Sequence, residues 1–342
     1  MTSHRPVHLT MGRRRCLRTI LILGGGLLAG VGLPQRGRAA MQKSRVVIVK
    51  TQDRDQGIRQ AMAAFGLTGF QGAGVAIKAN YNSADPFPAS THPETLETLI
   101  TEIKSAGCGP MVLAERSGMG DTAAVLESMG VNDICRKHGV EVVVMDDLGE
   151  DGYVRAAPGQ SHWKRGFLLA KPFAEADKVV QTCCLKTHQY GGHFTLSLKN
   201  AVGAVAKHDP SDGYNYMSEL HRSPRQRSMI AEISQVYRND LIVMDGMKAF
   251  VTGGPHAGRE VEPGVIVVGD DPVAVDAVGV AILRMYGTTA EVEEGDIFEQ
   301  EQIRRGVELG IGVEGSAGIE IIGLGVGSEE FVGKVKGALG VG

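Results

Sequence analysis

Short apolar segments alternate with amphipathic segments along most of the chain. Runs of β-branched and other apolar residues predict strands at 45–50, 74–78, 111–114, 140–145, 179–185, 241–244, 265–268 and 319–322. Apolar residues at helical spacing predict helices at 58–65, 93–106, 125–129, 230–237, 273–285 and 301–309. Strands and helices that alternate in this way indicate an α/β protein, with a mostly parallel sheet and helices on both of its faces.

Polar side chains stand at the ends of two of these strands. Lys78 ends the strand at 74–78 and Asn80 comes two residues later, while Lys186 and His188 follow the strand at 179–185. Residues two apart on an extended chain point to the same face, so each pair presents two side chains together. Ligands of open α/β sheets bind at the carboxyl ends of strands, and the sequence therefore predicts a pocket at this edge.

A second polar cluster follows a glycine turn. Gly191 and Gly192 precede a run that we expect to be helical, on which Thr195 and Lys199 stand four residues apart and Asn200 is one step round. The lysines at 78, 186 and 199 would bind a small anion, either a carboxylate or a phosphate, with help from the amide groups that begin the helix. The alternative is a solvated network in which these lysines pair with the aspartates at 245, 271 and 276.

The three aspartates have different local settings. Asp271 precedes Pro272 and a strongly apolar helix, as an N-cap does. Asp276 interrupts the apolar run of that helix and needs a partner, for which a nearby lysine is the natural candidate. Asp245 is followed by Gly246, so it is either a site residue at a strand end or part of a simple turn.

His188 has three alternative roles. Neighbouring lysines would lower the pKa of its imidazole and favour the neutral form, which accepts a proton or binds a metal ion. A divalent metal held by His188, Asp245 and Asp271 is one alternative, and a histidine with a purely structural hydrogen bond is another. No nucleophile motif of the G-x-S-x-G type is present.

Five segments in order resemble one family. They are 77–80, 185–188, 195–203, 244–246 with 253–255, and 271–277, and together they resemble the domain of unknown function 362 family over about residues 45–285. The resemblance implies no defined activity. Some members of that family carry ferredoxin-like cysteine clusters, which implies an association with iron–sulfur proteins. This chain lacks such clusters, and that argues against an electron-transfer role for it.

Four cysteines follow residue 40, and none forms a C-x-x-C pair. The sequence therefore offers no iron–sulfur or zinc cage made of cysteines. Cys108 and Cys135 could form a disulfide in an oxidising compartment, or all four cysteines could be small buried residues.

Residues 1–40 resemble a twin-arginine export signal. Arg13 and Arg14 precede an apolar, glycine-rich run at 20–33, and Ala39-Ala40 suits a signal peptidase. We therefore expect export to the periplasm through the twin-arginine translocase, with an uncleaved membrane anchor as the alternative. Residues 41–342 carry 29 basic and 39 acidic side chains, a formal net charge of −10, which argues against nucleic-acid binding.

These features predict an α/β domain at 41–290 and a helix and strand extension of the same domain at 291–342. The favoured function is an exported enzyme that handles a small anionic ligand, for which association with a divalent metal or a redox partner is one alternative. The alternative is a periplasmic binding or accessory protein for a redox partner. Catalytic roles fall to His188, Lys186 and Lys199; ligand binding falls to Lys78, Asn80, Thr195, Asn200 and Asp276.

Overall fold

The structure is a computed structural model that describes residues 43–341. The predicted export signal lies outside the described residues. Within residues 43–341, no helix has the length and apolar character needed to cross a membrane.

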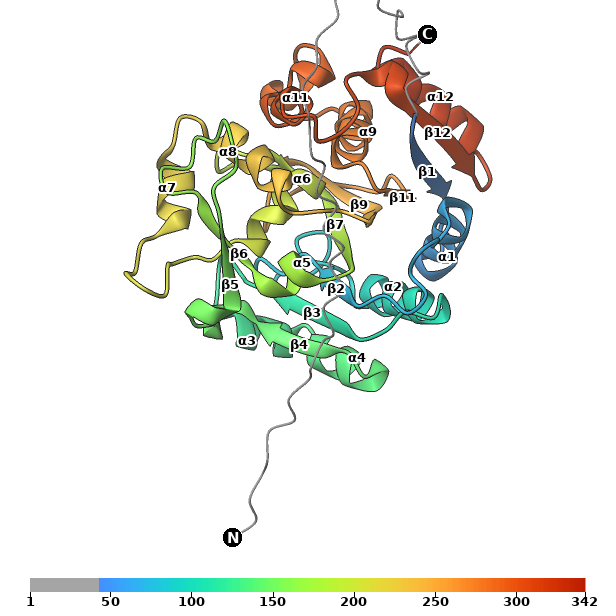
Figure 1. Cartoon of the computed structure of the whole chain (residues 1–342). Helices are drawn as coiled ribbons and strands as arrows, with labels where there is room; N and C mark the ends of the chain where they lie inside the picture. Colours follow the sequence, from blue (N-terminus) through green and yellow to red (C-terminus); the bar gives the residue numbers. More distant parts are fainter. Residues whose placement is uncertain (1–42, 342) are drawn as a thin grey trace, which may run out of the picture. The chain divides into compact units, whose positions relative to one another are not determined.

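One large mixed sheet forms the centre of the described domain (Figure 1). Its main path runs β12-β1-β11-β9-β7-β2-β3-β4; β10 pairs with β9, β8 pairs with β7, and β5 with β6 makes a separate ribbon. The strands are β1 Ser44–Lys50, β2 Val75–Lys78, β3 Met111–Glu115, β4 Glu141–Val144, β5 Tyr153–Ala156, β6 Phe167–Ala170, β7 Lys178–His188, β8 His193–Thr195, β9 Leu241–Gly253, β10 Gly258–Val261, β11 Val265–Gly269 and β12 Ile319–Leu324.

Helices cover both faces of this sheet (Figure 1). They are α1 Arg54–Phe65, α2 Pro93–Ser105, α3 Thr122–Ser128, α4 Val131–His138, α5 Lys171–Glu175, α6 Ser197–Asn200, α7 Tyr216–Arg222, α8 Gln226–Glu232, α9 Pro272–Met285, α10 Ala290–Glu293, α11 Glu301–Glu308 and α12 Ser328–Ala338. The predicted fold class is confirmed: the chain is an α/β protein with a mostly parallel mixed sheet.

Strand β1 shows why the sheet has two apolar faces. Its residues alternate between two cores: Val46 and Ile48 pack with α9 and α12, whereas Val47 and Val49 pack with α1 and α2. A strand covered on both faces reads as a continuous apolar run, because successive side chains point to opposite sides. A third apolar cluster lies around β5, β6 and α8.

Two features of the sheet differ from the expectation. Strands β7 and β9 continue well past the predicted ends, so that Lys186 and His188 lie inside β7 rather than after it. Strand β11 runs antiparallel to both of its neighbours, β1 and β9. Its carboxyl end therefore lies at the edge of the sheet opposite to the carboxyl ends of the parallel strands, which moves Asp271 to that opposite edge.

Candidate functional site

A small polar cavity of about 60 Å³ lies at the carboxyl ends of β2 and β3, beside β7. Of the described residues that line it, four are basic and only Glu115 is acidic. The lining residues are Lys78, Asn80, Tyr81, Asn82, Glu115, Arg116, Lys186, His188, Thr195, Lys199, Asn200, Val202, Gly203 and Pro255. We call this space the inner cavity. It gathers Lys78, Lys186, His188 and Lys199 as the sequence predicts, although their roles stay predictions.

Lys78 and Glu115 form a buried ion pair on one wall. Lys78 ends β2 and Glu115 ends β3, and these two parallel strands are neighbours. The Lys78 ammonium donates to both carboxylate oxygens, at 2.8 and 2.7 Å, and to the backbone oxygen of Ala79 at 2.6 Å. All three of its donors are used, so Lys78 shapes the cavity and has no donor left for a ligand.

Lys186 is fully buried and has no ionic partner of this kind. Its ammonium donates to Asn80 Oδ1 at 2.7 Å and to the backbone oxygen of Ala89. Burial lowers the pKa of Lys186, and the positive charge of Lys78 adds to this effect. Two of its three donors are occupied, so one remains for an anion.

Lys199 lies on α6 and is also buried. Burial lowers the pKa of Lys199 to about 8, and the charges of Lys186 and Arg116 act in the same direction. Within residues 43–341, no carboxylate lies within ion-pair distance of the Lys186 or Lys199 ammonium group. The two lysines therefore form a concentration of positive charge that needs a counter-ion.

His188 is almost completely buried. Burial lowers the pKa of His188 far below its usual range, and the charges of Lys199 and Lys186 lower it further, so the ring is neutral. The backbone N–H of Tyr190 donates to its Nδ1 at 3.2 Å. A neutral ring that accepts at Nδ1 carries its proton on Nε2, which makes His188 a hydrogen-bond donor to a ligand.

Neutral polar groups complete the inner cavity. Asn80 Nδ2 donates to Asn200 Oδ1 at 3.0 Å, and Asn200 Nδ2 donates to Gln181 Oε1 at 2.9 Å. These two hydrogen bonds fix the orientation of the Asn80 amide, which in turn positions the Lys186 ammonium group. Thr195 is different, because its buried hydroxyl has no partner among the described residues. An unpaired buried hydroxyl on a cavity wall indicates a place for a ligand atom or a water molecule.

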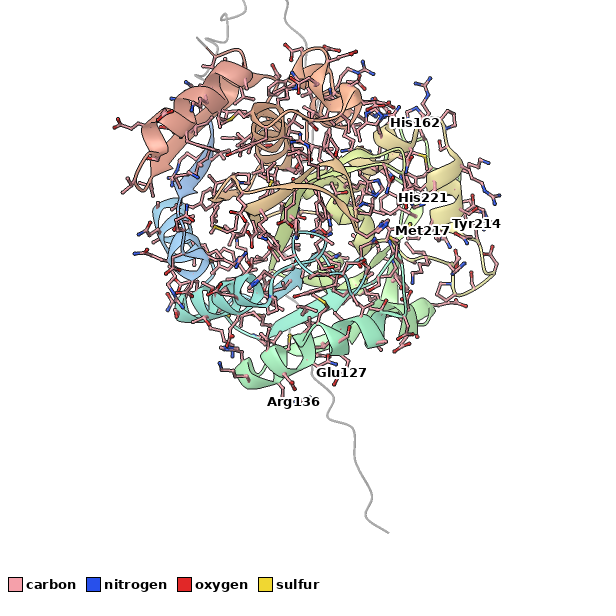
Figure 2. All side chains as sticks on the ribbon, turned by 180° about the vertical axis from the view of Figure 1, so that it is seen from behind. Glu127, Arg136, His162, Tyr214, Met217 and His221 are labelled. Atoms are coloured by element: carbon pink, nitrogen blue, oxygen red, sulfur yellow. The ribbon has the colours of Figure 1, made fainter. Side chains whose placement is uncertain are left out.

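A larger outer cavity of about 820 Å³ adjoins the inner one. The two share Asn82, Arg116, His188, Lys199, Val202 and Pro255. Residues of the segment 207–221 line part of the outer cavity, among them Met217 and His221 of α7 (Figure 2). The volume of the outer cavity falls in the range that is typical of small-molecule binding sites.

Tyr190 gives the outer cavity an aromatic surface. Its ring stacks on His256, with centroids 6.2 Å apart and an interplanar angle of 13°, and meets His188 edge-on at 5.7 Å. The tyrosine is half exposed and lines this cavity, so part of its aromatic surface is accessible to a ligand.

The sequence predicts a lysine as the partner of Asp276, and this prediction is wrong. Asp276 is fully buried in α9 and lines neither cavity. It accepts hydrogen bonds from Ser197 N at 2.7 Å, Ser197 Oγ at 2.5 Å and Leu198 N at 3.2 Å. These are the first amide groups of α6, so the carboxylate holds the start of α6, and those amides are not available to an anion.

The structure does not bring His188, Asp245 and Asp271 together as metal ligands. Asp245 accepts hydrogen bonds from Arg54 Nε at 2.9 Å and Thr95 Oγ1 at 2.5 Å, which ties α1 and α2 to β9. Asp271 caps α9 and also accepts from Ser44, which begins β1 at the opposite edge of the sheet. No group of three or more metal-binding side chains occurs in the part of the chain that the structure describes.

The four cysteines of the described residues line neither cavity. Cys108 and Cys135 are free thiols in this structure, as are Cys183 and Cys184 inside β7. Cys135, Cys183 and Cys184 are buried, which fits the interpretation of small core residues.

Sequence reasoning missed Arg116 as a cavity residue. Arg116 directly follows Glu115 at the end of β3, and its guanidinium donates to the backbone oxygen of Val202 at 2.8 Å. Its Nε has no partner among the residues that the structure describes. The strand-end rule that selected Lys78 would also have selected Arg116, because Lys78 ends β2, Arg116 directly follows β3, and these two strands are parallel neighbours.

The chain belongs to the family described as Domain of unknown function (DUF362), which it matches over residues 75–281. It is similar to a thylakoid-associated protein of Synechocystis sp., with 24% identity over 199 residues, or 58% of this chain and 59% of that protein.

Among solved structures, it is similar to the lactate racemase apoprotein from Thermoanaerobacterium thermosaccharolyticum. The TM-score is 0.40 and the identity 15%, over 66% of this chain and 54% of that one. The chain thus spans less than two thirds of the length of either relative.

Proposed function

We propose that this protein binds a small anionic organic molecule, with its carboxylate or phosphate group in the inner cavity and the rest of the molecule in the outer cavity. The observation that carries the proposal is the pair of buried ammonium groups, Lys186 and Lys199, without a counter-ion in the described part of the chain. Isolated buried charges cost several kcal/mol, and a bound anion removes that cost.

The donors are arranged for one anionic group. Within residues 43–341, Lys186 has one free N–H, Lys199 has all three, and His188 offers Nε2–H, while the Thr195 hydroxyl lacks a partner. The limited volume admits a group of the size of a carboxylate or phosphate, and the polar chain through Asn80 and Asn200 holds the lysine in place. An enzyme and a binding protein would share this arrangement, and turnover of the ligand separates them.

The test is calorimetric titration of the purified protein with inorganic phosphate and with a simple carboxylate such as lactate. We expect Lys186→Met and Lys199→Met each to weaken binding about a hundredfold, since a lost charge-assisted hydrogen bond costs about 2–3 kcal/mol. Methionine preserves most of the side-chain volume. The control is Lys178→Met, which removes a lysine paired with Asp240 at the start of β7. Equal affinities for wild type and both cavity variants would rule the anion site out.

A further inference from the structure

Lys199 differs from Lys78 and Lys186 in its position relative to the two cavities. It lines both cavities, so its side chain lies where the anion subsite adjoins the large outer space. Lys78 and Lys186 line only the inner cavity, and both have backbone or side-chain acceptors. Lys199 is therefore placed to meet the part of a ligand that directly follows its anionic group.

The surroundings of Lys199 ease the loss of its proton, so that a fraction of the neutral amine is present beside the ammonium form. Its neighbours in the cavity are cationic or neutral, namely Lys186, Arg116 and His188, and the Glu115 carboxylate is taken by Lys78. A lysine that is desolvated beside other cations loses its proton more easily, and a neutral amine is a nucleophile toward carbonyl groups. The pKa of about 8 follows from the same burial.

Resting on the proposed anion site, we infer that Lys199 forms a Schiff base with a 2-oxo acid. The carboxylate would bind at Lys186 and Thr195 in the inner cavity, which places the adjacent carbonyl carbon at Lys199. The small volume of the inner cavity favours a carbonyl next to the carboxylate over one farther along the chain. The side chain of the acid would extend into the outer cavity.

The chemistry of this step balances without a further reactant. The Nζ lone pair forms a bond to the carbonyl carbon, and the carbonyl π electrons move to the oxygen, which takes up a proton. The proton that this oxygen takes up is the one that nitrogen gives up, which yields a neutral carbinolamine. The oxygen then takes a second proton from solvent through the outer cavity and leaves as water, while the nitrogen lone pair forms the C=N bond. The products are a protonated imine and water. His188 lines the same cavity, and its Nε2–H is left to donate to the ligand because Nδ1 accepts from Tyr190 N.

The outer cavity also indicates which 2-oxo acids fit. Met119, Val202 and Met217 contribute apolar surface, and Tyr190 contributes an open aromatic face. Its volume greatly exceeds that of a methyl group. We therefore expect phenylpyruvate to react more readily than pyruvate, since burial of an aromatic ring adds favourable free energy.

Borohydride trapping tests the inference. The full protein is incubated with pyruvate, 2-oxobutyrate or phenylpyruvate, then reduced, and the mass of the intact chain and of its peptides is measured. We expect one adduct per chain, equal to the acid less one oxygen atom, on the peptide that contains Lys199. Lys199→Arg keeps a positive charge but cannot form an imine, and it should give no adduct. Lys178→Met, at the start of β7, should react as the wild type does.

Lactate separates this inference from the proposed anion site, because it has the carboxylate but no carbonyl. If the wild type binds lactate and yields no adduct with any of the three oxo acids, the Schiff base is wrong and the anion site stands. If lactate does not bind at all, the proposed anion site is wrong, and the inference that rests on it is wrong as well. Adducts spread over surface lysines, or an adduct that persists in Lys199→Arg, would also overturn the inference.

Discussion

At the scale of single residues, the site depends on charges that the fold keeps away from water. Lys186 and Lys199 are buried without carboxylates, whereas Lys78 has one at 2.7 Å. A protein tolerates buried unpaired charge only at a cost in stability, so such groups are concentrated at functional sites. The sequence predicts these three lysines together but cannot tell which of them is neutralised, since that depends on Glu115 from a different strand.

The cost of burying Lys199 has a measurable pH dependence. Its pKa is lowered from 10.5 to about 8, so the unfolded chain binds more protons than the folded one between these values. The stability of the empty protein should therefore fall as the pH falls from about 10.5 to about 8. Lys199→Met removes this group. As the pH rises from about 8 to about 10.5, the free energy of unfolding of the wild type should therefore increase by roughly 3 kcal/mol more than that of the variant.

Urea denaturation of both proteins at pH 8 and pH 10 measures this difference. Comparison of the two proteins at each pH cancels the other groups that titrate in the same range. A constant difference between wild type and variant would show that Lys199 is not buried as a charged group.

At the scale of elements, the position of Lys199 depends on how α6 begins. This helix spans only four residues, too few to be stable by itself. Asp276 from α9 accepts hydrogen bonds from its first two amide groups and from the Ser197 hydroxyl. The buried carboxylate, which lies outside both cavities, thus positions Lys199 through the helix.

We expect Asp276→Ala to destabilise the protein by about 3 kcal/mol at pH 7, because buried amide groups lose their acceptor. Burial raises the pKa of Asp276 from 3.8 to about 7, so the folded state binds more protons between these values. This contribution to stability is present below about pH 4 and is lost as the pH rises through 7. The effect of the substitution should therefore be larger at pH 5 than at pH 7.

Urea denaturation at the two pH values measures it, with the exposed Glu320→Ala on β12 as the control. A smaller effect at pH 5 than at pH 7 would contradict the assigned direction of the pKa shift.

The elements also show which parts of the fold are readable from sequence. Apolar runs located every main strand, and the two-residue spacing placed Lys186 and His188 on one face of β7. The direction of β11 was not readable, because an apolar strand has the same pattern in a parallel and an antiparallel pairing. That single reversal moved Asp271 to the opposite edge and removed it from the expected metal site.

At the scale of the whole molecule, charge is distributed unevenly. Residues 41–342 carry a formal net charge of −10, yet the inner cavity is lined by four basic residues and one acidic residue. An anionic ligand is therefore repelled by much of the protein and attracted at one place, which favours selectivity for that place over general anion binding. Seven further basic residues precede position 41 and bring the formal net charge of the full sequence to −3.

Those seven residues include the arginine pair of the predicted export signal, for which we propose a direct test. Arg13→Lys with Arg14→Lys keeps the charge but replaces the planar guanidinium groups, which lysine does not mimic. We expect the double variant to stay in the cytoplasm at full length, whereas the wild type reaches the periplasm with a shortened N-terminus. Cell fractionation and the mass of the purified chain measure both. Arg36→Lys with Arg38→Lys, in the same segment, is the matched control. Normal export of the first variant would exclude the twin-arginine route, and a full-length wild type in the membrane fraction would favour the uncleaved anchor.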